Sequence, residues 1–466
     1  MKRRLPVLMS TFALMAAMLV AAGPVATAAE PDIKDQLEAI PGMTVVSDQP
    51  LGSYRFFILS FTQPTDHRHP EAGTFEQRLT LLHRDTARPM VLHTTGYGVP
   101  TFPFRSEPTQ LIDGNQISVE QRFFTPSRPE PADWDKLTIW QAATDHHRIV
   151  QALKTLYRGK WISTGESKGG MTSVYHRRFY PSDVDGTVVY AAPDDAVNAE
   201  DSAYDRFFAN VGTDPACRTA LDGVQIEALE RRDAMVAKYS AWATANNRTF
   251  TTIGSADKAF ELMVNGAPWA FWQYSLQSFC VNVPARDAPD DAIYNWITGV
   301  YGVDSLTDQG LDYYVPYYFQ AAKQLGWPTV ELNHLATLQH YRGQDDAAAN
   351  VPDAIDPRFQ PLAMADIDRW VKLHGSQLLF VYGSDDPYGA EPFRLGRGTI
   401  DSLSYVAPGA NHGADIAALT ADEAATATAA VQRWAGVATN ATLRAAPSYI
   451  PSLDDRNLAL DRRYSR

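Results

Sequence analysis

The stretch "WISTGESKGG" (Trp161–Gly170) is the part of the sequence that decides the fold class, because five mostly apolar residues run directly into a glycine-rich turn. Ser167 is the centre of a Gly-x-Ser-x-Gly pattern, and the "MTSVYHRRFYP" that follows has helical character. A serine at a sharp turn from a strand into a helix is held in a strained conformation that exposes its hydroxyl above the sheet. The pentapeptide alone is equally compatible with a structural turn. The strand before it and the helix after it favour a nucleophile.

Strand-like runs surround this turn on both sides. They lie at 53–61, 76–83, 89–94, 115–120, 160–165, 186–192, 376–383 and 401–407. From residue 89 onward they lose strict alternation, as strands covered on both faces do. A long amphipathic segment, "DWDKLTIWQAATDHHRIVQALKTLY", separates the fourth run from the fifth. Alternating strands and helices around a serine turn predict an α/β-hydrolase fold with an eight-stranded, mostly parallel sheet.

The pattern changes between residues 196 and 372, where helical segments rich in aromatic residues replace the strands. We interpret 196–372 as a helical cap inserted between the sixth and seventh strands. Residues 29–195 and 373–466 would then form the two parts of the α/β-hydrolase domain, with a C-terminal tail. Near the end of the insertion, "GQDDAAANVPDAIDP" (343–357) is interpreted as an exposed acidic loop.

A serine needs a histidine to remove its proton, and the histidine needs a carboxylate to orient it. In this fold the acid and then the histidine follow the serine along the chain. Asp386 lies just after the seventh predicted strand, in "YGSDDPYG", and His412 just after the eighth, in "PGANHGAD". The predicted triad is therefore Ser167, Asp386 and His412. Asp385, or Asp194 or Asp195 after the sixth strand, remain alternatives for the acid.

A tetrahedral oxyanion needs two backbone N–H donors, one of them from the residue after the nucleophile. That residue is Lys168, whose side chain is expected to form a salt bridge. The second donor should come from the loop after the third strand, "HTTGYGVP", where Tyr97 or Gly98 is the candidate.

The first 28 residues are typical of a secretory signal peptide. Three basic residues precede a long apolar run, and a small-residue site ends at Ala28. An uncleaved membrane anchor is the alternative, and Arg3-Arg4 would also suit a twin-arginine signal. Cleavage near Ala28 would export a soluble protein to the extracellular space or the periplasm.

Removal of residues 1–28 would leave 38 basic and 54 acidic side chains, a net charge of −16. This charge disfavours nucleic acid and anionic membranes as partners. The two cysteines, Cys217 and Cys280, would meet an oxidising compartment and are expected to form a disulfide. The spacing of His334 and His340 does not suit zinc, and we expect no metal and no cofactor.

Several stretches together resemble the secreted bacterial prolyl tripeptidyl aminopeptidases, which are α/β-hydrolase serine peptidases. They are "QPTDHRHPEAGTFEQRLTLLHRD" (63–85), "TTGYG", "SVEQRFF" (118–124), "TGESKGGM" and "YGSDDPY". The chain is also distantly similar to lysosomal Pro-X carboxypeptidase and dipeptidyl peptidase II. Those relatives have Gly-Gly-Ser-Tyr-Gly at the serine turn where this chain has Gly-Glu-Ser-Lys-Gly, which favours the tripeptidyl group.

The resemblance implies hydrolysis of peptides from the free N-terminus, three residues at a time, with proline before the cleaved bond. Such an enzyme needs a carboxylate for the substrate ammonium, and Glu120 is the candidate; an ion pair with Arg122 or Arg148 is its alternative role. Trp269, Trp272 and Tyr313 are candidates for an aromatic proline pocket, although cap aromatics also form cores. A secreted esterase or lipase with the same triad is the main rival function, and a non-catalytic binding module is the second.

Overall fold

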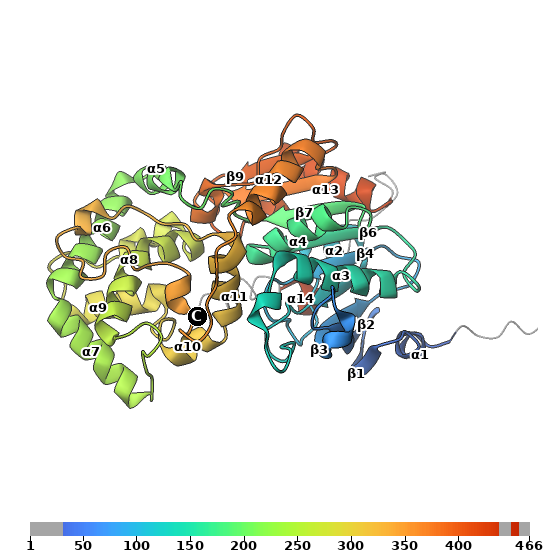
Figure 1. Cartoon of the computed structure of the whole chain (residues 1–466). Helices are drawn as coiled ribbons and strands as arrows, with labels where there is room; N and C mark the ends of the chain where they lie inside the picture. The colour runs from blue at the N-terminus through green and yellow to red at the C-terminus, as the bar shows by residue number, and fades with distance from the viewer. Residues whose placement is uncertain (1–30, 438–448, 456–466) are drawn as a thin grey trace, which may run out of the picture.

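In the computed structural model, which describes residues 31–437 and 449–455, one nine-stranded sheet forms the centre of the part of the molecule that lies on the right in Figure 1. The strands are β1 (Met43–Leu51), β2 (Tyr54–Pro64), β3 (Thr74–His83), β4 (Met90–Thr94), β5 (Asn115–Val119), β6 (Trp161–Glu166), β7 (Gly186–Tyr190), β8 (Leu378–Gly383) and β9 (Leu403–Ala407). Their order across the sheet is β1-β2-β3-β5-β4-β6-β7-β8-β9. Strands β1, β2, β3 and β5 pair antiparallel, and all pairs from β5 to β9 are parallel.

The eight predicted strands are present as β2 to β9, and the sheet is mostly parallel, as predicted. The prediction missed the edge strand β1, which pairs with β2 alone. Most residues of β1 are partly or fully exposed, so its sequence "MTVVSDQPL" carries little of the apolar pattern that marks a buried strand. Every residue of β7 and β8 is buried, which explains why these strands do not alternate.

Helices cover both faces of the sheet. The helices of the sheet region are α1 (Ile33–Glu38), α2 (Glu107–Ile112), α3 (Ile139–Leu153), α4 (Lys168–Phe179), α12 (Leu362–His374), α13 (Ala421–Trp434) and α14 (Pro451–Asp454). Helices α3, α4 and α12 share an apolar core with β8, whereas α2 and α13 contribute to a separate core that contains Val91 and Ile162 of β4 and β6. This two-sided covering is the layering expected of an α/β-hydrolase.

Seven helices between β7 and β8 form a separate group beside the sheet (Figure 1). They are α5 (Ser202–Asn210), α6 (Pro215–Glu230), α7 (Arg232–Ala245), α8 (Ala256–Tyr274), α9 (Asp290–Tyr301), α10 (Asp308–Asp312) and α11 (Val315–Gln320). Residues from α6 to α10 share their own apolar core, which includes Tyr239, Phe260 and Ile297. We call helices α5 to α11 the cap.

A disulfide joins Cys217 of α6 to Cys280 of the short 3-10 helix η3 (Gln277–Asn282), as expected from the two cysteines. Among the described residues, no helix has both the length and the apolar character that a membrane crossing requires. The predicted signal peptide lies outside the described residues.

Candidate active site

Ser167 lies at the turn between β6 and α4, in a conformation that non-glycine residues rarely adopt. Its φ is 53° and its ψ is −125°. The backbone can turn this tightly because Gly165 and Gly169 lack side chains: a Cβ on Gly165 would overlap the carbonyl of Gly169, and one on Gly169 would overlap the carbonyl of Thr94. The serine N–H donates to the Tyr190 carbonyl at 2.9 Å, which ties the turn to β7. This is the geometry of a nucleophile turn.

Asp386 and His412 form the pair that the sequence predicted. The Nδ1 atom of His412 is 2.8 Å from Oδ2 of Asp386, and the Asp386 side chain is fully buried. Its other oxygen accepts from the Tyr388 N–H at 3.1 Å. Asp385 bonds to Ser384 instead, so the contact to the histidine belongs to Asp386.

The Nε2 atom of His412 is buried and has no hydrogen-bond partner among the described residues. His412 and Ser167 line the same cavity, at the ends of β9 and β6. With its Nδ1 side held by a carboxylate, the imidazole presents Nε2 to accept a proton within this cavity.

The segment 408–417, which follows β9 and carries His412, is called the histidine loop here, and it is held by residues that no pattern in the sequence indicates. The His412 N–H donates to the Gln273 carbonyl of α8 at 3.1 Å, which links the loop to the cap. On the other side, the Glu107 carboxylate accepts from the N–H groups of Ile416 and Ala417 at 2.9 and 3.0 Å. Burial raises the pKa of Glu107 to about 7. These partners come from distant parts of the chain, so no local pattern marks them.

Lys168 follows the nucleophile, and its side chain is buried beneath the loop after β4. Its Nζ donates to the Gly96 carbonyl at 2.5 Å and lies 5.4 and 5.6 Å from the ring centres of Tyr97 and Phe124. No carboxylate pairs with it within the described residues, so the expected salt bridge is wrong. Burial lowers the pKa of Lys168 to about 7. An ammonium so far from water finds its partners in a carbonyl and two aromatic rings instead.

The loop after β4 contacts the nucleophile turn directly. Gly96 has a φ of 71°, and a Cβ there would lie 2.6 Å from the Gly169 nitrogen. Of the two candidate donors on this loop, the Gly98 N–H already donates to the Tyr313 hydroxyl at 3.1 Å. The Tyr97 N–H makes a longer bond, 3.2 Å, to Thr95 Oγ1. Both N–H groups therefore have a partner within the protein, but Tyr97 lines the cavity and Gly98 does not. Tyr97 stays the predicted second donor.

Glu120 does not line the cavity, and its carboxylate is fully engaged by the protein. Oε2 accepts from Arg78 at 2.5 Å and from the Val99 N–H at 3.0 Å, and Oε1 accepts from the Ser127 hydroxyl at 2.7 Å. The side chain is completely buried. The expected contact with a substrate ammonium is thus not supported, and the partner is Arg78 rather than Arg122 or Arg148. Sequence could not select Arg78, because it reaches Glu120 only through the pairing of neighbouring strands.

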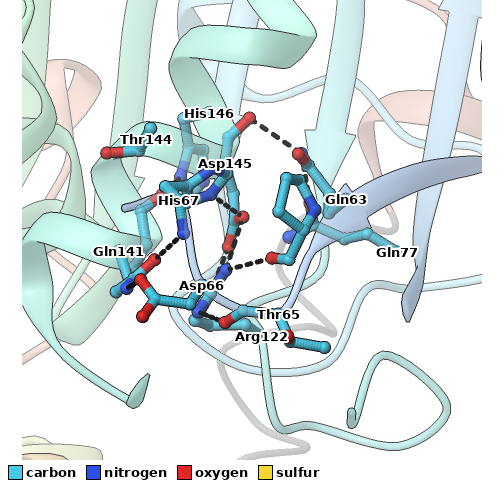
Figure 2. Close-up of polar contacts among 12 residues, drawn as sticks. Gln63, Thr65, Asp66, His67, Gln77, Arg122, Gln141, Thr144, Asp145 and His146 are labelled. Carbon is cyan, nitrogen blue, oxygen red and sulfur yellow. Dashed lines mark hydrogen bonds and ion pairs between the residues drawn. The ribbon is translucent and has the colours of Figure 1, made fainter. Parts of the chain in front are cut away.

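Residues of the sequence motifs next to Glu120, among them Gln77 and Arg122, belong to a buried polar network (Figure 2). Arg122 forms a two-pronged ion pair with Asp145 of α3, with bonds of 2.6 and 2.8 Å, and the His67 ring lies 2.7 Å from the same carboxylate. Beside it, Gln63 donates to Gln77 at 2.9 Å, and Gln77 donates to the backbone carbonyl of Glu120 at 2.7 Å. This network therefore fixes the end of β5, against which the loop after β4 is bonded.

The three aromatic candidates have different surroundings. Trp269 lines the cavity and packs edge-on against Tyr388, with ring centres 5.0 Å apart. Trp272 is buried in a cap core with Phe271 and Cys217, so its expected contact with substrate is wrong. Tyr313 is outside the cavity lining, where its hydroxyl accepts the Gly98 N–H. Trp269 and Trp272 are neighbours three residues apart on α8, yet only Trp269 lines the cavity, which the sequence alone did not reveal.

The cavity has a volume of about 1510 Å³ and lies between the sheet and the cap. Sites for small molecules commonly have volumes of about 300–1,000 Å³. The larger space suits an extended chain of several residues. Tyr97, Trp269, Tyr317 and Tyr388 are among the aromatic residues that line it.

The sheet order, the strained serine turn and the Asp386–His412 pair together define a serine hydrolase of the α/β-hydrolase class. Within that class the chain belongs to the S37 peptidases, because the sequence model described as PS-10 peptidase S37 matches residues 26–465. The chain is also 56% identical over 417 residues to the prolyl tri/tetrapeptidyl aminopeptidase of Streptomyces mobaraensis. The aligned region covers 89% of this chain and 87% of that protein.

Similar solved structures are more remote. A proline iminopeptidase from Mycobacterium smegmatis is 13% identical, with a TM-score of 0.35. The aligned region covers 84% of this chain and 98% of that chain. The Rv0554 protein of Mycobacterium tuberculosis is 15% identical, with the same TM-score of 0.35, and covers 82% of this chain and all of its own.

Proposed function

We propose that this protein is a serine exopeptidase that releases short peptides, most often tripeptides, from the free N-terminus of its substrates after proline. The observation that carries this proposal is the position of the Ser167 turn and the Asp386–His412 pair on one large cavity covered by the cap, in a chain of the S37 peptidase family. The name of the Streptomyces mobaraensis relative supports the same substrate class.

The proposed reaction begins when His412 Nε2 takes the proton of the Ser167 hydroxyl and the serine oxygen attacks the scissile carbonyl. The N–H groups of Lys168 and Tyr97 stabilise the oxyanion that forms. His412 then gives its proton to the leaving amine, so the C-terminal part of the substrate departs and the N-terminal fragment remains as an ester on Ser167. Water, deprotonated by the same histidine, hydrolyses that ester. Asp386 stabilises the imidazolium at both stages.

The cap supplies the proposed selectivity. Helices α5 to α11 would cover the cavity as a lid, so that only a free chain end could enter. The predicted insertion, 196–372, is too long at its end, because α12 packs on the sheet. The ring of Trp269, which packs edge-on against Tyr388, is proposed to offer its face to the proline side chain, because proline packs well on aromatic faces.

We propose that the protein is exported, with cleavage near Ala28. The Cys217–Cys280 disulfide supports this location, since disulfides persist outside the reducing cytosol. N-terminal sequencing of the protein recovered from the culture medium or periplasm tests the proposal. A mature N-terminus at or near residue 29 is the expected result, and retention of residues 1–28 in the cell membrane would contradict it.

The proposed nucleophile is tested with a fluorophosphonate probe, which labels activated serines. Ser167→Ala should abolish both labelling and peptide hydrolysis and leave the thermal unfolding midpoint unchanged. Ser163→Ala, at a buried position on the same strand, is a control for changes in β6 and should keep its label. Labelling of the Ser167→Ala protein would refute the assignment. Hydrolysis of acyl esters without hydrolysis of Ala-Ala-Pro substrates would favour the esterase alternative.

A further inference from the structure

Six carboxylates line the cavity, and the structure distinguishes one of them. They are Glu166, Asp205, Asp222, Glu331, Asp345 and Asp346. Asp205 accepts the Glu331 N–H at 2.9 Å, Glu331 pairs with Arg342 at 3.3 Å, Asp222 is 3.8 Å from His334, and Asp346 accepts the Ala349 N–H at 2.8 Å. Glu166 also interacts with another group of the protein. Within the described part of the chain, Asp345 alone among the six has neither a hydrogen bond nor an ion pair.

The surroundings of Asp345 are those of a cavity wall. Its side chain is open to water, yet protein atoms enclose it closely enough to raise its pKa to about 6. Desolvation is the main cause, and the neighbouring Asp346 adds to it. A partly desolvated carboxylate without a partner is stabilised when a cation binds beside it. The acidic loop at 343–357 is largely exposed, as expected, and its Asp345 also lines the cavity.

A line of tyrosine rings leads from the proposed oxyanion loop toward Asp345. The ring centres of Tyr97 and Tyr317 are 5.6 Å apart, and those of Tyr317 and Tyr318 are 5.2 Å apart. Asp345 lies near enough to Tyr318 and to Tyr301 to raise the pKa of both hydroxyls. Tyr97, Tyr317 and Tyr318 all line the cavity, so a peptide that lies along their rings would run from the oxyanion loop toward Asp345.

We propose that Asp345 binds the α-ammonium group of the substrate and thereby sets how many residues lie between the free N-terminus and the bond attacked by Ser167. This inference rests on the proposed exopeptidase function, and it replaces Glu120 as the group that recognises the chain end. The ammonium would make charge-assisted hydrogen bonds to the carboxylate, and the tyrosine rings would pack along the intervening residues.

The test compares Asp345→Asn with the wild type on two substrates, Ala-Ala-Pro aminomethylcoumarin and its N-acetyl derivative. The wild type should prefer the free amine. Asp345→Asn should lower kcat/KM for the free amine by about 10- to 100-fold, the value of one charge-assisted contact, and leave the rate on the acetylated substrate unchanged or higher. Fluorophosphonate labelling should remain at the wild-type rate. Asp346→Asn, which changes the adjacent carboxylate, is the matched control and should keep the preference.

The outcomes separate this inference from the proposed function. A wild type that hydrolyses neither substrate, or does not distinguish them, contradicts the exopeptidase itself. A wild type that prefers the free amine, together with an Asp345→Asn variant that keeps the full preference, overturns the role of Asp345 alone. An effect confined to substrates with a lysine or arginine side chain would also overturn it, because the carboxylate would then bind a side chain instead of the chain end.

Discussion

At the scale of single residues, Glu120 illustrates how a carboxylate can serve a site that it does not enter. It accepts the Val99 N–H from the loop after β4, and the backbone of its neighbour Gln121 donates to the Tyr97 carbonyl at 2.8 Å. Both bonds fix the loop that is proposed to bind the oxyanion. Arg78 and Ser127 hold the carboxylate from the other side. Glu120 is therefore best understood as a positioning residue.

Glu120→Gln should lower kcat by about 10- to 100-fold with little change in KM. A glutamine has one oxygen in place of two, so either the Val99 N–H and the Arg78 guanidinium or the N–H and hydroxyl of Ser127 lose their acceptor, at a cost of about 1–3 kcal/mol. Kinetics on free-amine and N-acetylated peptides measure the effect, which should be equal for the two. A loss confined to the free-amine substrate, seen mainly in KM, would instead restore Glu120 as the ammonium site.

Some residues of the candidate site could be predicted because their signal is local. Ser167 stands in a five-residue pattern between a strand and a helix, and Asp386 and His412 each follow a strand in a fixed order. Asp345 and Glu107 have no comparable signal, since their surroundings are built by segments far away in the chain. Lys168 directly follows the nucleophile in the sequence, but the sequence does not indicate the surroundings of its side chain, because Gly96 and Tyr97 are on another loop.

At the scale of elements, the cap and the histidine loop are physically connected through the end of α8. The Gln273 carbonyl accepts from His412, and the Ser275 carbonyl accepts from Asn411 at 3.4 Å. The disulfide between α6 and η3 lies immediately after this point and closes a separation of 63 residues. The cap therefore both covers the cavity and supports the loop that carries the proposed base.

The double variant Cys217→Ser/Cys280→Ser should be less stable by up to about 4 kcal/mol, the loop entropy expected for a closure of this length. Its kcat should also fall, because a looser end of α8 holds the histidine loop less firmly. Denaturant unfolding and peptide kinetics measure the two effects, and reduction of the wild type should reproduce both. Lower stability with an unchanged kcat would show that the disulfide does not support the histidine loop.

The elements differ in how well sequence predicts them. Buried strands such as β6 and β8 are short apolar runs between turns, and these were predicted. The edge strand β1 was missed, because one neighbour and an exposed face leave its composition mixed. The helical character of the cap was also predictable, whereas which face of α8 meets the cavity depends on packing.

At the scale of the whole molecule, the junction between sheet and cap contains several acidic side chains, and burial there raises the pKa of Asp195. Asp195 follows β7 where the chain enters the cap, and its Oδ2 lies against Gly326, where the chain returns. Burial, together with the nearby Asp201 and Glu391, raises the pKa of Asp195 to about 7. The folded protein thus holds a proton here that the unfolded chain releases near pH 4.

Because the pKa is higher in the folded state, this group contributes stability at low pH that is lost as pH rises from about 4 to about 7. Asp195→Asn removes the titration. The unfolding free energy of the variant should be closer to that of the wild type at pH 5. At pH 8 it should exceed the wild-type value by on the order of 2 kcal/mol. Denaturant unfolding at the two pH values measures this, with Asp356→Asn, an exposed carboxylate, as control. An equal offset at both pH values would refute the explanation.

The proposed function depends on which end of a peptide enters the cavity and how far the peptide reaches. The most direct measurement is mass spectrometry of the products formed from an unblocked peptide that begins Ala-Ala-Pro-Ala. We predict that the first product is Ala-Ala-Pro, that the Ser167→Ala protein forms none, and that N-acetylation slows its release. Three results would contradict the proposed function: release of single residues or dipeptides from the N-terminus, removal of residues from the C-terminus, or cleavage within the chain.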